Sequence, residues 1–509
     1  MKREEAIISM RGALDWLQSQ GEVKVLKEPV DPILEMGAIM KALDEGPALL
    51  ADNVKGYSHA RLVGNLFARK DRVAKLLGAA DYSQCKRKIM HALKNPTPAR
   101  IVEKGPCQEV YIPREEVDPF ALFPMIKHTE QDGGRFFGSG VHFIGGKYFR
   151  GGTQLALYRM SFRGKDYASI NMVPGGHGDL VCENFPNEKI PCTVNISPSP
   201  MVEFVARSNL MPIVFPPGLD ELGVAGTLQG SPVNIVKART VDAYAIADAE
   251  WVIEGYIVPY ERVWETEEAE KAGKQGEFFF HPEWARYLGR AYRNRKFEVT
   301  AVTRRKDKPL CYAPFFGSSA GDSPFIEANW MEMADRLFPG FVVDVSHFLG
   351  LTAWSGIVFQ VKKRRRSDEG LQRNLLAAAL GVVRGLRLAV VVDDDINIHS
   401  PEDLFFALVT RVSPETDIIR GTGGRGQSYQ PMERVAAGAD AGKSRPVSMF
   451  EGGIGIDATV PLMARDHFQR PRYAVDKVDM HKWFTEEELQ KIRQNQSEYI
   501  RFLAETGYP

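Results

Sequence analysis

The chain has 509 residues, more than one hydrophobic core accommodates, so two or three domains are expected. Its 65 basic and 65 acidic residues balance, which argues against nucleic acid as the main partner. No window has the length and apolarity of a signal peptide or membrane span, and the five scattered cysteines contain no CxxC pair, so we expect a cytoplasmic protein with reduced thiols and no membrane partner.

The first part of the chain, residues 1–105, alternates helical and strand patterns. Apolar residues at helical spacing mark about residues 3–20, 33–43 and 82–93. Strand-like segments lie between them, and RLVGNLF followed by ARKDRVAKLLG reads as strand then helix. We therefore expect an N-terminal α/β domain.

Residues 106–300 change to short alternating strands such as EVYI, LALYRMSF and EWVIEGYIV, separated by Gly and Pro. This pattern is typical of an antiparallel, barrel-like β domain. One helix, MVEFVARSN, interrupts it, and the charged stretch WETEEAEKAGKQG reads as a surface loop.

Residues 301–475 return to alternating strands and helices, which predicts a C-terminal α/β domain. The apolar LAVVV followed by three aspartates is typical of a buried central strand, at whose C-terminal edge α/β proteins often keep sites. The KKRRR run at residues 362–366 reads as a solvated strand end. Residues 476–509 are expected to form a helical tail at an oligomer contact.

Two unusual residues lie in the segment 151–180. Arg159 shares one strand face with Leu155 and Leu157, and a half-buried guanidinium needs a carboxylate, either from a protein side chain or from a substrate acid. His177 lies in the Gly-rich loop PGGHG, where the backbone can approach a ligand; a solvated surface His is the alternative. The combination indicates a functional site.

The sequence has no HExxH, Cys cluster or Walker motif, and GTGGRG lacks the preceding strand of a Rossmann fingerprint. Gln154, His177 and Glu221 offer an amide oxygen, an imidazole and a carboxylate, a set that suits Mg²⁺ or Mn²⁺ holding a phosphate. Glu221 is expected between a Pro-Gly turn and a strand. Glu277 precedes three aromatic residues, which can desolvate its carboxyl group and so favour a role as general acid. For Glu221 and for Glu277, the alternative is an ordinary solvated turn residue.

The sequence resembles the UbiD family of reversible decarboxylases, and most closely the members that act on hydroxylated aromatic acids. The resemblance spans nearly the whole chain and rests on motifs in the family's order, namely NVKGY, LYRM with GGHGD, DELGVAG with GTLQGSPVNIV, AEWVIEG and VVDDDINI. It implies an α/β fold in which a split β-barrel of flavin-reductase type lies between N-terminal and C-terminal α/β parts, assembled as a homodimer or larger homo-oligomer.

The resemblance also implies a cofactor, prenylated FMN, whose phosphate is held through Mn²⁺ or Mg²⁺, with K⁺ as a further ion. The metal positions are Gln154, His177 and Glu221, and the family has Asn where this chain has Gln154. Arg387 stands where the family has a Lys near the phosphate, and Arg159 also faces the cofactor.

The family joins its catalytic Arg to two Glu of an EGPFGE motif. Arg159 matches the Arg and is implied to orient the substrate carboxylate, and Glu277 matches the second Glu, the implied proton donor. The first Glu aligns with Ala272, and Glu270 lies close by as its candidate replacement.

The implied function is reversible, non-oxidative decarboxylation of an aromatic or heteroaromatic carboxylic acid with release of CO₂, a flavin prenyltransferase supplying the cofactor. Two alternatives stay open. An ordinary FMN-dependent flavin reductase would share the barrel. A non-catalytic or assembly subunit of a multi-subunit aromatic carboxylase would fit the departures at Gln154 and Ala272.

Overall fold

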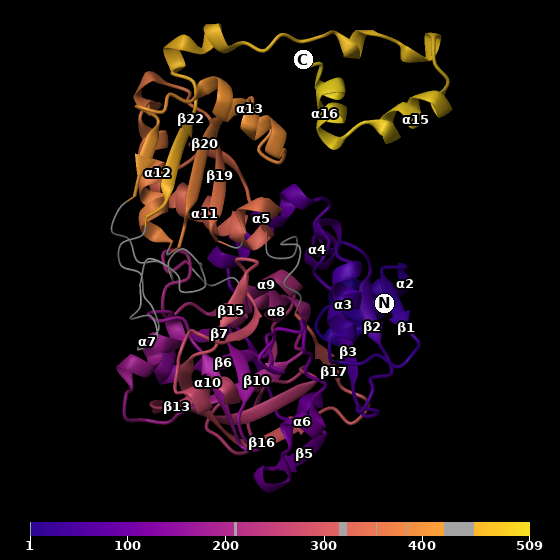
Figure 1. Cartoon of the computed structure of the whole chain (residues 1–509), viewed down its shortest axis with the longest axis vertical. Helices are drawn as coiled ribbons and strands as arrows, with labels where there is room; N and C mark the ends of the chain where they lie inside the picture. The colour runs from indigo at the N-terminus through magenta and orange to yellow at the C-terminus, as the bar shows by residue number, and fades with distance from the viewer. Residues whose placement is uncertain (1, 208–210, 315–322, 353, 384, 422–451) are drawn as a thin grey trace.

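The computed structural model describes residues 2–207, 211–314, 323–352, 354–383, 385–421 and 452–509. The GTGGRG motif lies outside the described residues from position 422 onward. In the described part of the chain, no helix combines the length and hydropathy that crossing a membrane requires. Figure 1 shows an N-terminal unit, a central β-rich unit, a C-terminal unit above it, and a tail that arches away from the body.

The N-terminal unit is built on a four-stranded sheet in the order β1-β2-β3-β17. Its strands are β1 (Val23–Leu26), β2 (Ala48–Ala51), β3 (Arg61–Gly64) and β17 (Leu310–Tyr312). Its helices are α1 (Arg3–Ala6), α2 (Met10–Ser19), α3 (Glu35–Ala42), α4 (Lys70–Leu77) and α5 (Tyr82–Lys94). Because β17 follows the central unit in the sequence, the chain returns to its first sheet before entering the C-terminal unit.

The central unit contains an antiparallel eight-stranded sheet in the order β7-β6-β10-β13-β16-β9-β8, with β5 also paired to β16. The strands are β5 (Val110–Pro113), β6 (Val141–Gly145), β7 (Thr153–Leu157), β8 (Arg159–Phe162), β9 (Tyr167–Asn171), β10 (Ile190–Ile196), β13 (Trp251–Trp264) and β16 (Arg293–Arg304). Among the described pairings, β7 and β8 end the sheet without bonding to each other, so the sheet is a half-barrel.

Smaller elements surround this sheet. The helices are α6 (Pro119–Leu122), α7 (His177–Asn184), α8 (Pro200–Ala206), α9 (Glu221–Gln229) and α10 (Glu267–Ala272). A small sheet joins β4 (Arg100–Val102), β11 (Asn234–Lys237) and β12 (Tyr244–Ile246), and a hairpin joins β14 (Phe279–Pro282) to β15 (Leu288–Arg290). The hairpin and α10 fill the interval between β13 and β16.

The C-terminal unit has a five-stranded sheet in the order β18-β19-β20-β22-β21, in which β19, β20 and β22 run parallel. The strands are β18 (Val342–Ser346), β19 (Gly356–Val361), β20 (Leu388–Asp393), β21 (Ile418–Arg420) and β22 (Ile454–Ala458). The helices are α11 (Ser323–Leu337), α12 (Leu371–Val382) and α13 (Pro401–Arg411), followed by α15 (Glu486–Asn495) and α16 (Glu498–Thr506) in the tail.

One apolar core crosses the three units. Phe204 of the central unit stacks on Phe67 of the N-terminal unit, with ring centroids 5.6 Å apart, and meets Phe325 of α11 edge-on at 4.5 Å. All three side chains are buried. The shared core fixes the C-terminal unit against the other two, since separating them would expose these rings to water.

The mixed α/β class and the antiparallel central sheet agree with the sequence prediction, but several local predictions were wrong. Glu221 begins helix α9 rather than preceding a strand. The segment expected as one strand, LALYRMSF, is divided into β7 and β8 at Tyr158. The expected surface loop WETEEAEKAGKQG contains the end of β13 and the helix α10. The two helices begin at local capping residues, Asp220 and Thr266, whose side chains accept from the backbone N–H three residues later.

Candidate active site

The centre of the site is Arg159, the first residue of β8. Its Nε donates to Oε1 of Glu265 at 2.7 Å, and its Nη2 donates to Oε2 of the same carboxylate at 2.8 Å. Glu265 is fully buried, and its Oε2 also accepts from the backbone N–H of Tyr292 at 2.7 Å. This bidentate pair fixes both the plane and the rotation of the guanidinium.

The outer nitrogen of the same guanidinium contacts two further side chains. Arg159 Nη1 donates to Oε1 of Glu283 at 2.8 Å and lies 2.6 Å from Nε2 of His281. Arg159 Nη2 also donates to the carbonyl of Arg290 at 2.8 Å. Every N–H group of the guanidinium therefore has an acceptor. Burial alone would lower the pKa of Arg159, but the carboxylates of Glu265 and Glu283 raise it above its ordinary value.

The hairpin β14–β15 brings Glu283 to this position. Glu283 lies in its turn, where its backbone N–H donates to Tyr287 O at 2.9 Å. A Cβ on Gly289 would lie 2.7 Å from Cγ of Glu283, which is closer than side chains allow. Gly289 therefore permits the Glu283 side chain to fold back toward Arg159.

The structure does not bring Glu277 or Glu270 to Arg159. Glu277 is 51% exposed and pairs with Lys274 at 3.0 Å. Glu270 is 52% exposed and pairs with Arg163 on the surface of α10. In place of the two predicted carboxylates, Arg159 binds Glu265 and Glu283, neither of which the sequence analysis singled out.

Two signals in the sequence could have found this pair. Glu265 directly follows the long strand β13, which crosses the half-barrel beside β16, and Glu283 follows the aromatic run FFFHP. The compact EGPFGE motif misled the alignment, because here α10 and β14 separate the two Glu that flank the Arg.

The predicted metal ligands Gln154, His177 and Glu221 come from β7, the start of α7 and the start of α9. Nδ1 of His177 lies 3.5 Å from Oε1 of Glu221, and Oε2 of Glu221 accepts from Leu155 N at 2.7 Å, so the carboxylate lies against the strand that carries Gln154. The amide Nε2 of Gln154 donates to the Tyr158 hydroxyl at 3.0 Å, which leaves its Oε1 as the end available to a cation.

Buried atoms without hydrogen-bond partners support a cation here. Within the described residues, the two ring nitrogens of His177 and the Oε1 atom of Gln154 have no hydrogen-bond partner, although both side chains are buried. An oxygen and a nitrogen donor left unpaired beside a carboxylate fit Mn²⁺ or Mg²⁺. No cluster of three or more His, Cys, Asp or Glu suited to a metal occurs in the part of the chain that the structure describes. The Gln154 amide would therefore be the third ligand.

Arg387, the predicted phosphate-binding residue, directly precedes β20. Its backbone N–H donates to Ser355 O at 2.8 Å, and its carbonyl accepts from Ile454 N at 2.9 Å. The side chain is half-buried at the N-terminal end of the parallel strands. Arg387 therefore lies at the opposite end of β20 from the aspartates at 393–395.

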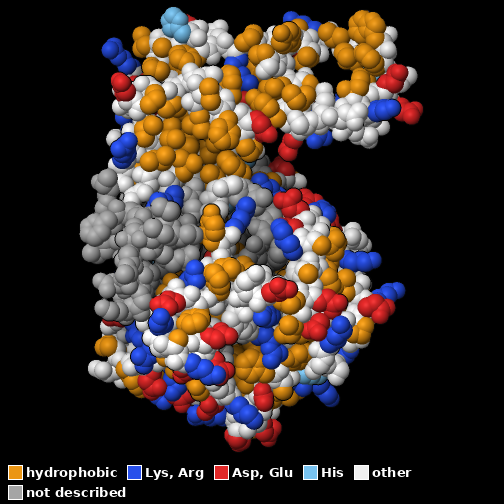
Figure 2. All heavy atoms as spheres, viewed as in Figure 1, with side chains coloured by type: hydrophobic (Ala, Val, Ile, Leu, Met, Phe, Trp, Pro, Cys, Tyr) orange, Lys and Arg blue, Asp and Glu red, His pale blue; other side chains and the backbone are white. Residues whose placement is uncertain are grey.

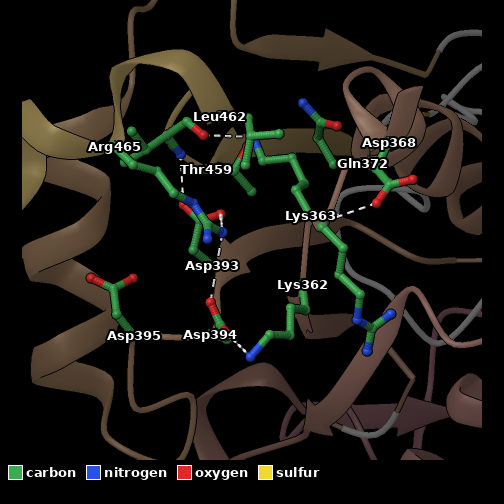
Figure 3. Close-up of polar contacts among 12 residues, drawn as sticks. Lys362, Lys363, Asp368, Gln372, Asp393, Asp394, Asp395, Thr459, Leu462 and Arg465 are labelled. Carbon is green, nitrogen blue, oxygen red and sulfur yellow. Dashed lines mark hydrogen bonds and ion pairs between the residues drawn. The ribbon is translucent and has the colours of Figure 1, made fainter. Parts of the chain in front are cut away.

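At the C-terminal end of β20, basic side chains of the protein itself pair with the aspartates (Figure 3). Lys362 pairs with Asp394 at 2.8 Å, and Arg465 reaches Asp393 at 3.5 Å. Lys363, expected to be solvated, is 1% exposed and donates to Val460 O at 2.6 Å. These pairs anchor the chain that leaves β22 toward the tail. The edge therefore has a structural explanation, and the candidate site remains the one around Arg159.

Three family models match consecutive parts of the chain. All three describe 3-octaprenyl-4-hydroxybenzoate carboxy-lyase. The model of its N-terminal domain matches residues 14–93, that of its Rift-related domain matches residues 100–318, and that of its C-terminal domain matches residues 323–458. Among curated proteins, gallate decarboxylase of Lactiplantibacillus plantarum is 29% identical over 449 residues, covering 86% of this chain and 89% of that protein. Anhydromevalonate phosphate decarboxylase of Methanosarcina mazei is 26% identical over 473 residues, covering 91% and 99%.

Solved structures agree in fold over nearly the whole chain. The apo 3,4-dihydroxybenzoic acid decarboxylase from Enterobacter cloacae superposes with a TM-score of 0.79 at 27% identity, covering 94% of this chain and 99% of that one. The UbiD-class enzyme HmfF from Pelotomaculum thermopropionicum, in complex with FMN, gives a TM-score of 0.78 at 26% identity, covering 94% and 100%. Because the three models match most of the chain in the family's domain order, the chain belongs to the UbiD family of carboxy-lyases.

Proposed function

We propose that the protein decarboxylates an aromatic or heteroaromatic carboxylic acid with prenylated FMN, reversibly and without net oxidation. The observation that carries the proposal is Arg159 held between Glu265 and Glu283 in the half-barrel. The relatives support the chemistry: gallate and 3,4-dihydroxybenzoic acid decarboxylases are similar along most of the chain, and HmfF has been solved with FMN and, in an evolved dimeric form, with prFMN.

The buried set Gln154, His177 and Glu221 would hold Mn²⁺ or Mg²⁺ against the flavin phosphate, with Arg387 as a further phosphate contact and K⁺ as an additional ion. This assignment rests on the donor chemistry of the three side chains. When bound, a prenylated flavin supplies an electron-accepting ring that delocalises the charge left by departing CO₂. The half-barrel of flavin-reductase type would be the surface on which that ring lies.

Within this proposal, the protein's own groups bind, orient and protonate. Glu265 keeps Arg159 in one orientation, and Glu283, at 13% exposure the more accessible carboxylate, delivers the proton to the carbon that loses CO₂. Glu283 thereby takes the role that the sequence interpretation gave to Glu277. Because every N–H of Arg159 already has an acceptor, the substrate carboxylate can bind Arg159 only by displacing one of them, and Glu283 on Nη1 is more accessible than Glu265.

Within this proposal, both departures that favour a non-catalytic subunit have an answer. Ala272 lies at the end of α10, and Arg159 obtains its first carboxylate from Glu265 instead. The departure at Gln154 keeps an amide oxygen. Neither position therefore removes a group that the reaction requires.

The decisive experiment is anaerobic co-expression with a flavin prenyltransferase, mass analysis of the flavin released from the purified protein, and a screen of aromatic acids for CO₂ release. Prenylated FMN and turnover of at least one acid are expected. An ordinary FMN with reductase activity would support the flavin reductase, and a flavin-free, inactive protein would support the assembly subunit.

We further propose that the tail contributes to a homo-oligomer contact. In Figure 2 apolar side chains gather over the C-terminal unit and the tail. Val409 on α13 is 82% exposed, and Trp483 in the tail is 66% exposed. Large apolar side chains this exposed are typical of interfaces, and the tail and α13 lie on the same side of the molecule (Figure 1).

A further inference from the structure

Tyr158 is the single residue between β7 and β8, where the chain leaves one end of the half-barrel sheet for the other. The residue is 9% exposed, and its ring centroid lies 5.0 Å from that of His142. Its hydroxyl oxygen accepts from Nε2 of Gln154 at 3.0 Å. A rigid, buried side chain therefore places a polar atom directly against one of the predicted metal ligands.

The two ends of the Gln154 amide differ in what they can bind. The oxygen can coordinate a cation, whereas the N–H₂ group only donates hydrogen bonds. Within the described residues, the hydrogen bond to Tyr158 is the only one that the Gln154 side chain makes, and its Oε1 atom has none. The Tyr158 hydroxyl thus holds the nitrogen end and leaves the oxygen end for a cation.

The same hydroxyl lies against the helical turn that carries His177. A Cβ on Gly178 would lie 2.2 Å from the Tyr158 hydroxyl oxygen, which is closer than side chains allow, so Gly leaves the room that the hydroxyl needs. His177 directly precedes Gly178 at the start of α7, and its ring packs 5.2 Å from Phe149. The hydroxyl therefore lies between one predicted ligand and the neighbour of another.

Glu221, the third predicted ligand, is placed on the same strand by other contacts. Its Oε2 accepts from Leu155 N at 2.7 Å. On the other side of Gln154, the Thr153 hydroxyl donates to Asp220 Oδ1 at 2.6 Å, just ahead of α9. The start of α9 is thus fixed to the residues that flank Gln154, while the orientation of the Gln154 amide depends on Tyr158.

We propose that Tyr158 is a positioning residue for the cation site, which accepts the amide N–H of Gln154 so that the amide oxygen faces the cation. This inference rests on the metal site within the proposed function. Without the hydroxyl, a cation on Oε1 would leave the N–H₂ group of Gln154 buried and without its acceptor. Because an unpaired buried donor is costly, the cation would bind more weakly.

The test measures Mn²⁺ binding by the full-length protein in saturating FMN, from the electron paramagnetic resonance signal of free Mn²⁺. Tyr158→Phe removes only the hydroxyl and should weaken Mn²⁺ binding by about 10- to 100-fold, the usual effect of losing a group that orients a metal ligand. Gly178→Ala should also weaken it, because the added Cβ displaces the hydroxyl, and this variant takes over if Tyr158→Phe does not fold. Unchanged Mn²⁺ affinity in the folded variant would overturn the proposal.

A cycle of single and double substitutions separates positioning from packing. Gln154→Leu removes the amide that Tyr158 orients, so adding Tyr158→Phe to Gln154→Leu should change the Mn²⁺ affinity by less than about twofold. An equal loss with and without the amide would show that Tyr158 acts by packing alone and would overturn the proposal.

Tyr57→Phe is the matched control. It removes a similarly buried hydroxyl, which donates to Phe120 O at 2.6 Å away from the predicted ligands. Tyr57→Phe should lower the melting temperature and leave the Mn²⁺ affinity unchanged. An equal loss of Mn²⁺ affinity in Tyr57→Phe and Tyr158→Phe would overturn the proposal, because the effect would then follow from stability.

These readouts need no turnover, so they separate the inference from the proposed function. If no acid is decarboxylated but Tyr158→Phe weakens Mn²⁺ binding, the decarboxylase assignment fails and the positioning role stands. If turnover is normal and the Mn²⁺ affinity of Tyr158→Phe equals that of wild type, the positioning role fails alone. A wild-type protein that binds no Mn²⁺ would overturn the metal site and this inference together.

Discussion

Replacing Glu283 by Gln should abolish most of the turnover while leaving the protein folded and loaded with cofactor. In the wild type, Arg159 Nη1 donates to Glu283 Oε1 at 2.8 Å. The Gln side chain keeps an oxygen that can accept this hydrogen bond, but it cannot deliver a proton. General acid catalysis contributes about 10²- to 10⁴-fold, so kcat should fall by at least about a hundredfold. The free energy of unfolding should fall by only about 1 kcal/mol, because a neutral hydrogen bond replaces a charged one.

Glu277→Gln is the matched control for this variant. The Glu277 side chain is 51% exposed and pairs with the exposed Lys274, and the contact of Glu277 with Arg290 uses its backbone carbonyl, which the substitution keeps. Exposed pairs of this kind are worth about 0–1 kcal/mol and lie outside the site, so kcat should stay within about twofold of wild type.

The assay follows CO₂ release by the anaerobic holoenzyme, together with exchange of the product's ring proton with solvent deuterium. Exchange uses the same group as base that decarboxylation uses as acid, so both rates should fall together in Glu283→Gln. Near wild-type exchange in Glu283→Gln, combined with loss of exchange in Glu277→Gln, would refute the assignment drawn from the structure and restore the one drawn from sequence.

Four further outcomes are expected. Glu265→Gln should cost roughly 3–5 kcal/mol in urea unfolding, because it leaves the buried Arg159 charge without its bidentate partner; an unchanged midpoint would contradict the buried pair. His177→Ala should lose metal and flavin together, as measured by elemental analysis and flavin absorbance; full content of both would exclude the metal site. Burial raises the pKa of Glu203 to about 8, so the folded protein loses stability as the pH rises from about 4.5 to 8. Glu203→Gln should therefore raise the melting temperature more at pH 8 than at pH 5. An equal change at both pH values would show that Glu203 does not titrate in this range. Deleting residues 471–509 should lower the mass measured by light scattering to that of a monomer, and an unchanged oligomer would place the contact elsewhere.

The sequence by itself determined the family, the class of fold and one residue of the candidate site. The motifs follow one another in the family's order, and an Arg inside an apolar strand requires a carboxylate whatever the fold, because a buried guanidinium without one is too costly. Arg159 was therefore predictable as a residue with a carboxylate partner. Gln154, His177 and Glu221 were likewise named from donor chemistry and motif order, and their convergence in the structure adds unpaired buried atoms to that argument.

Only the tertiary structure decided which carboxylates Arg159 binds. Four acidic residues follow Glu265 within α10 and the loop after it, and the alignment to the family's EGPFGE motif selected Glu277 and Glu270 rather than the pair that contacts Arg159. Glu270 is exposed on α10 and Glu277 is exposed in the loop after it, while the turn of the β14–β15 hairpin brings Glu283 to Arg159. A strand pairing between residues distant in sequence sets that geometry, and no periodicity within the segment encodes it.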